Sequence, residues 1–113
     1  SMVVNENNEV LAIRLSKRQN ANQTTVNWTH QLFQNTPNPF TDFTSVRFSL
    51  PQSETVNISI YDAYGKRVYE KVQSYHAGEH ELRLTTSEWT SGIYTCTMQT
   101  NHYNATIKML VIK

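Results

Sequence analysis

Residues 56–68 read VNISIYDAYGKRV and contain a complete β-hairpin pattern. Val56, Ile58 and Ile60 alternate with polar residues, which is the period of a strand with one buried face. Asp62 stands where a type I turn favours an Asx side chain, and Gly65 follows three residues later, where a positive φ is needed. Residues 66–73, KRVYEKVQ, can then run back along the first strand. The stretch therefore predicts a hairpin.

The same period of two recurs on both sides of this hairpin. Pro51 ends the preceding strand, because proline cannot donate to a strand ladder. Turns at Ala77-Gly78 and Asn101-His102 separate the strands that follow. No helical period is evident after Asn38. Short strands with regular turn signals predict an all-β fold, an Ig-like antiparallel β-sandwich of about seven strands. One face of these strands carries Val46, Phe48, Leu50, His80, Leu82, Leu84, Tyr94, Cys96, Met98, Ile107, Met109 and Val111.

The first 33 residues are less regular. Residues 9–15, EVLAIRL, and residues 24–33, TTVNWTHQLF, both have the apolar content of strands. The polar residues 16–23 between them are typical of a flexible linker. We therefore expect the sandwich domain over residues 24–113, and over residues 1–23 an expression remnant at Ser1-Met2, a strand segment and the linker. Residues 10–15 fit either the end strand of an upstream domain or an extra edge strand of this one.

Length and charge limit the class of protein. A chain of 113 residues with 38% hydrophobic side chains suffices for one folded domain with its own core. The net charge of +1 gives no electrostatic reason to expect a nucleic acid or an anionic membrane as partner. No apolar run reaches the roughly 18 residues of a membrane-spanning helix, and no N-terminal signal peptide pattern occurs.

Residues with catalytic or metal-binding chemistry do not form a recognisable site in the sequence. Cys96 is the one cysteine, so it cannot form an internal disulfide, and its place inside a strand pattern favours a buried apolar role. His76 and His80 lie on either side of the Ala77-Gly78 turn, so they do not share a helix face as metal ligands would. Phosphate loops and nucleophile motifs are absent. We expect no enzyme, no metal and no cofactor.

The tyrosines leave one alternative function open. Five of them fall at turns or on alternate faces, where they could form a carbohydrate-binding platform, although tyrosines also cover sheet faces in many sandwiches. A surface adhesion or carbohydrate-binding β-sandwich is therefore the alternative to the function discussed next. These tyrosines are Tyr61, Tyr64, Tyr69, Tyr75 and Tyr103.

The order of the motifs carries more information than any one of them. QNTPNPF (34–40) is followed by TSVRFSLP (44–51), VNISIYDAYGKRV (56–68), AGEHELRL (77–84), SGIYTCTMQT (91–100) and IKMLVIK (107–113). In this order, residues 33–113 closely resemble the C-terminal sorting domain of type IX secretion (Por secretion) cargo, type A. The motif positions of that family correspond here to Pro37, Asn38, Pro39, Phe40, Gly65, Gly78, Ser91, Gly92, Tyr94, Lys108 and Lys113.

The resemblance implies a non-catalytic signal domain. Proteins of this family come from Bacteroidetes-type bacteria, enter the periplasm with a signal peptide of their own, and cross the outer membrane because a dedicated translocon recognises the C-terminal sandwich. A sortase-like protease at the surface then usually removes the domain, and the cargo is anchored or released. Removal is expected before Phe33. Thr36 and Cys96 depart from the residues that are usual in the family.

The resemblance also implies partners, namely the type IX translocon, the sortase-like protease and a covalently attached upstream cargo. Lys108 and Lys113 have no evident core role, so they are candidates for direct contact with this machinery, although a terminal lysine also serves solubility and edge protection. The motif glycines are expected to permit turns, and Tyr94 to anchor the core. Extended geometry before each proline would make QNTPNPF a stiff elbow that Phe40 fixes to the core. Open edge strands could also pair two copies into a homodimer.

Overall fold

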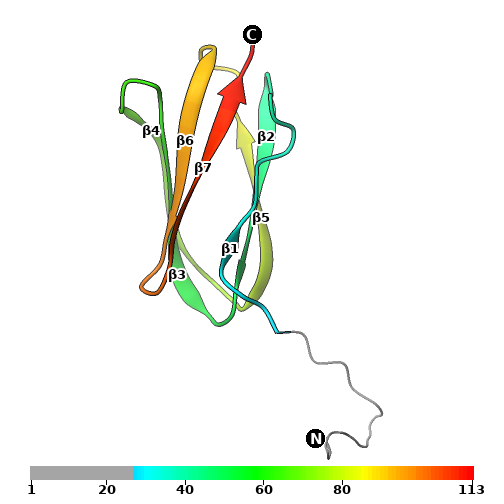
Figure 1. The fold of residues 1–113 in the computed structure, drawn as a ribbon, viewed down its shortest axis with the longest axis vertical. Helices are drawn as coiled ribbons and strands as arrows, with labels where there is room; N and C mark the ends of the chain where they lie inside the picture. The colour runs from blue at the N-terminus through cyan, green and yellow to red at the C-terminus, as the bar shows by residue number, and fades with distance from the viewer. Residues whose placement is uncertain (1–26) are drawn as a thin grey trace, which may run out of the picture.

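The structure is a computed structural model that describes residues 27–113, and over these residues it consists of seven strands and turns (Figure 1). The described residues contain no helix that could cross a membrane. The predicted all-β class is confirmed. The strands are β1 (Gln31–Leu32), β2 (Phe43–Leu50), β3 (Glu54–Tyr61), β4 (Arg67–Tyr75), β5 (Gly78–Thr85), β6 (Gly92–Gln99) and β7 (Asn104–Val111).

The strands form two antiparallel sheets that face each other as a sandwich (Figure 1). One sheet has the order β1-β2-β5 and the other has the order β4-β3-β6-β7. The chain therefore crosses between the sheets after β2, β4 and β5. The two ends of the sandwich are named as follows. The end at which β7 finishes is called the terminal end. The opposite end, at which Leu50 of β2 pairs with Gly78 of β5, is called the base.

The core lies between the sheets and follows the period of two in the sequence. Every second residue of the long strands points inward, because successive side chains of a strand lie on opposite faces. The buried apolar residues are Phe40, Val46, Phe48, Leu50, Val56, Ile58, Ile60, Leu82, Leu84, Tyr94, Cys96, Met98, Met109 and Val111. This set agrees with the sequence-based prediction except for His80 and Ile107, which are only half-buried.

The β3–β4 hairpin forms as the sequence predicts. The Asp62 carboxylate accepts hydrogen bonds from the backbone N–H groups of Tyr64 and Lys66, each at 2.9 Å. Gly65 has a φ of 84°, a conformation that a residue with a Cβ adopts only with strain. The turn chemistry thus fixes the register of β3 against β4.

The strand predicted over residues 24–33 is much shorter in the structure. Of residues 27–33, which are the described part of this stretch, Gln31 and Leu32 form ladder pairs with β2. The carbonyl of Thr29 accepts a hydrogen bond from the side chain of Ser49 at 2.6 Å, so a hydroxyl takes the place of a backbone ladder partner there. Trp28 is 40% exposed. The predicted strand at residues 9–15 and the linker at 16–23 lie outside the described residues.

Candidate recognition surface

The segment from Thr36 to Phe40 crosses from one sheet to the other. Thr36 forms an antiparallel bridge with Ser45 of β2, and Phe40 forms a parallel bridge with Val111 of β7. The Thr36-Pro37 and Asn38-Pro39 peptide bonds are both cis. This crossing joins the start of the domain to its last strand.

Hydrogen bonds from this segment cover the outer edge of β7. The N–H of Phe40 donates to the carbonyl of Leu110 at 3.0 Å, and the N–H of Ile112 donates to the carbonyl of Phe40 at 2.9 Å. The N–H of Leu110 donates to Oδ1 of Asn38 at 2.9 Å. Farther along, Nε2 of Gln34 donates to the carbonyl of Lys108 at 2.7 Å. Edge groups that could pair with another chain are thereby satisfied within the domain.

Two buried polar side chains, those of Asn35 and Thr44, bind the backbone of the crossing segment at Pro37. Asn35 is 2% exposed and Thr44 is fully buried. Nδ2 of Asn35 donates to the carbonyl of Pro37 at 3.1 Å and to Oγ1 of Thr44 at 3.0 Å, while Thr44 donates to the same carbonyl at 2.8 Å. Buried polar groups are costly unless they are paired, so these contacts favour a single conformation of the crossing segment.

Three aromatic rings connect the crossing segment to the loop before β6. Phe40 is 3% exposed and meets Trp89 edge-on, with 6.3 Å between ring centroids. Trp89 stacks on Tyr94 at 4.7 Å. The Tyr94 hydroxyl donates to the carbonyl of Thr90 at 2.8 Å. The rings therefore fix residues 86–91 against the core at the terminal end.

Lys113 is held by the same loop. Its ammonium group donates to the carbonyl of Thr86 at 3.0 Å and to that of Ser87 at 3.3 Å. Its backbone N–H donates to Oγ of Ser91 at 2.9 Å. Asp42 adds an ion pair at 4.0 Å. The side chain of Lys113 thus has structural partners that the sequence did not indicate.

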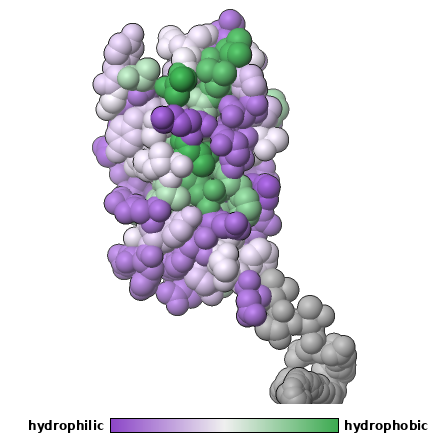
Figure 2. All heavy atoms as spheres, viewed as in Figure 1, coloured by the Kyte–Doolittle hydropathy of each residue, from purple (hydrophilic) through white to green (hydrophobic). Residues whose placement is uncertain are grey.

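Lys108 lies on the outer face of the four-stranded sheet and is exposed. Next to it is an apolar ridge, which we define as Ile93, Leu110 and Ile112, with exposed fractions of 52%, 37% and 52%. Figure 2 shows hydrophobic surface gathered at the terminal end, near the end of β7. Lys108, Asn38, Ile93 and Leu110 also line a shallow hollow together. A cation thus stands beside an exposed apolar surface.

Comparison with protein families matches residues 36–113 to the secretion system C-terminal sorting domain. The chain belongs to this family. It is the sorting domain of type IX secretion, and the expected family relationship is confirmed. A search of curated proteins finds no match.

Most of the residues that the resemblance assigns to the sorting motif lie at the terminal end, although they are far apart in the sequence. Gly78, which begins β5, lies at the base, and Gly65 lies at the terminal end but in the β3–β4 turn, beside the edge strand farthest from β7. Gly92, next to Ser91, faces Val111 in the β6–β7 ladder. The residues brought together are Pro37, Asn38, Pro39, Phe40, Ser91, Gly92, Tyr94, Lys108 and Lys113.

Sequence reasoning missed several residues of the sorting domain that build the terminal end. Asn35 and Thr44 are polar and would be expected at the surface, and their burial depends on pairing across nine positions of the chain. Trp89 lies in a loop that has no periodicity. Its aromatic side chain, five residues before Tyr94, is the one sequence signal that could have identified it.

The structure also places Cys96, His76 and His80, the residues with catalytic or metal-binding chemistry that the sequence analysis considered. No group of three or more metal-ligating side chains is placed to hold a metal ion in residues 27–113. Burial raises the pKa of the Cys96 thiol to about 12, so the thiolate that a nucleophile needs is scarce. Nε2 of His80 lies 2.7 Å from the carbonyl of His76 and donates to it.

Proposed function

We propose that this domain is a non-catalytic C-terminal signal that directs the protein attached to its N-terminal side across the outer membrane through the type IX secretion system. Membership of the sorting-domain family supports this directly. Within that function, we assign recognition by the translocon to the terminal end, and a sortase-like protease at the surface then removes the domain. The cargo passes through the periplasm and ends at the cell surface or outside.

The observation that carries the assignment to the terminal end is the division of roles among its residues. Phe40, Tyr94 and Lys113 are engaged in internal contacts, so they build the surface. Lys108 and the apolar ridge are exposed, so they are free to contact another protein. Interfaces between proteins combine apolar centres with polar or charged rims, and the terminal end has this arrangement on a small scale.

A reporter fusion tests the function. Residues 16–113 are fused to the C-terminus of a periplasmic reporter and expressed in a bacterium with a working type IX system, and in the same strain without the translocon. We expect reporter activity outside the outer membrane only when the translocon is present. A reporter that stays in the periplasm of both strains would refute the proposal.

Surface variants of the same fusion test the assignment to the terminal end. Replacing Lys108 with Ala, or Leu110 with Ser, should reduce export severalfold while the domain stays folded, because both side chains are exposed at the hollow. Glu81 is exposed on β5, in the other sheet, and Glu81→Gln is the matched control. Equal export of all three variants would show that the translocon does not recognise the terminal end.

A further inference from the structure

The chain enters the domain along the base of the sandwich, at the end opposite to the terminal end (Figure 1). Three contacts hold residues 28–30 there. A Cβ on Gly78 would lie 3.8 Å from Nε1 of Trp28, so the indole ring packs over the start of β5. The carbonyl of Thr29 accepts from Ser49 of β2. Nε2 of His30 lies 2.7 Å from Oε2 of Glu54, the first residue of β3, and donates to it.

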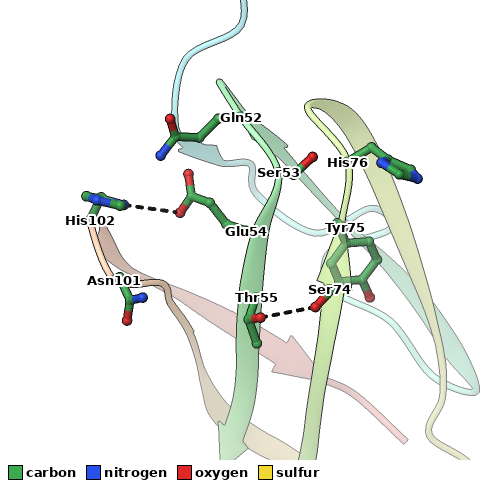
Figure 3. Close-up of a pocket in the computed structure, with 9 residues that line it drawn as sticks. All are labelled: Gln52, Ser53, Glu54, Thr55, Ser74, Tyr75, His76, Asn101 and His102. Atoms are coloured by element: carbon green, nitrogen blue, oxygen red, sulfur yellow. Dashed lines mark hydrogen bonds and ion pairs between the residues drawn. The ribbon is translucent and has the colours of Figure 1, made fainter.

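Glu54 is the centre of these contacts. Its side chain is 5% exposed, so an ionised carboxylate here needs partners. The ring of His30 stacks on Tyr103 from the β6–β7 turn, with 4.9 Å between centroids and an angle of 8°. On the other side, Nδ1 of His102 lies 3.8 Å from Oε1 of Glu54. Figure 3 shows Glu54 and His102 pointing toward each other across the hollow at the base.

The surroundings of Glu54 lower the pKa of its carboxyl, although Oε1 has no hydrogen-bond partner among the described residues. Burial by itself raises the pKa of the Glu54 carboxyl, but the Thr100 side chain, the hydrogen bond with His30 and the charges on His30 and His102 lower it more. The net pKa is below its ordinary value, so the group is ionised at neutral pH. Charge-assisted hydrogen bonds are about twice as strong as neutral ones, so the contact with His30 is the strongest single contact of residues 28–30.

We propose that the base is a docking site for the chain that leads into the domain, with Glu54 as the anchoring residue. Docking shields residues 28–33 from proteolysis, so the protease that removes the domain cuts before Trp28. The position of the cut rests on the proposed function, whereas the docking of the segment at the base does not. Proteases act on segments that are unpaired and exposed, whereas this segment contacts side chains of two strands and one turn and the backbone of β5 at Gly78.

Hydrogen exchange on the purified 113-residue chain tests the docking. We expect Glu54→Gln to speed amide exchange at residues 29–32 at least about tenfold, because a hydrogen bond to a charged group is lost, while exchange in β3 and β6 stays as in the wild type. Glu81→Gln should change neither. Unchanged exchange at residues 29–32 in a folded Glu54→Gln variant would overturn the docking. Trp28→Ala loosens the segment without touching Glu54 and gives the same readout if Glu54→Gln fails to fold.

Mass spectrometry of the domain released from cells tests the boundary. We expect the wild-type fragment to begin at or before Trp28, and Glu54→Gln to give additional fragments that begin within residues 29–33. A wild-type fragment that begins after Trp28 would overturn the proposed boundary. Absence of any export would refute the sorting function instead, and the exchange experiment would still decide whether the segment docks.

Discussion

At the scale of single residues, identical side chains have different roles that depend on the direction in which the backbone presents them. Phe40 and Phe43 are three positions apart, yet Phe40 is buried in the core and Phe43 is 42% exposed on the outer face, where the guanidinium group of Arg83 lies over its ring. Lys108 and Lys113 differ in the same way, since one is exposed and the other is bound to a loop. Each pair provides an internal control.

Phe40→Ala should lower the free energy of unfolding by about 3 to 5 kcal/mol, because it leaves a cavity between Trp89 and β7. Phe43→Ala should cost about 1 kcal/mol or less, because its ring is partly in water. Urea unfolding of both variants measures the difference. Equal losses would mean that Phe40 does not fix the crossing segment to the core.

The two lysines should separate stability from export. Lys113→Ala leaves two loop carbonyls without their charged donor and should cost about 1 to 2 kcal/mol in urea unfolding. Lys108→Ala should change stability by less than about 0.5 kcal/mol, because the side chain is exposed. If Lys108 contacts the translocon, its substitution reduces export all the same. Normal export of Lys108→Ala would show that the contact is absent.

At the scale of the elements, the strands could be predicted from the sequence and several of their partners could not. Alternation defines β2, β3, β5, β6 and β7, since one buried face imposes a period of two, whereas β4, which has no fully buried residue, follows from the turn before it. The bridge between Phe40 and Val111 and the contact between His30 and Glu54 join segments with no local pattern in common. The length of β1 could not be predicted either, because it depends on the register against β2, which places Thr29 opposite Pro51, a residue with no N–H to donate, and the Ser49 side chain bonds the Thr29 carbonyl instead. Long-range hydrogen bonds of this kind leave no periodic signal.

The junction between the entering chain and β3 should depend on pH. The pKa of Glu54 is lowered in the folded state, so its stabilising effect is present above the ordinary carboxyl pKa of about 4.3 and is lost as the pH falls through the folded value. The facing titratable groups are His30, His102 and, across the ladder, Tyr75. Wild type should therefore lose more stability than Glu54→Gln between about pH 5 and pH 3. Urea midpoints across this range provide the check, and parallel curves would contradict it.

At the scale of the whole molecule, the two sheets enclose one continuous core, and Cys96 lies inside it without exposure. Its thiol can react only when the sandwich opens, because the raised pKa and the burial both suppress the thiolate. We expect a disulfide reagent at pH 8 to label Cys96 at least about a thousandfold more slowly in the native protein than in urea. Fast labelling of native protein would indicate local opening of β6.

Because Asn38 and Phe40 pair with the end of β7, the terminal end forms only when the chain extends through its last strand. Asn38 and Leu110 are 72 positions apart, so a chain interrupted before Leu110 has neither the last strand nor the partner that positions the crossing segment. If the translocon reads this end, it reads a surface that exists only after the whole domain has been made and folded. A truncated protein would then fail to be exported because it lacks the recognised surface, and no separate quality-control step would be needed.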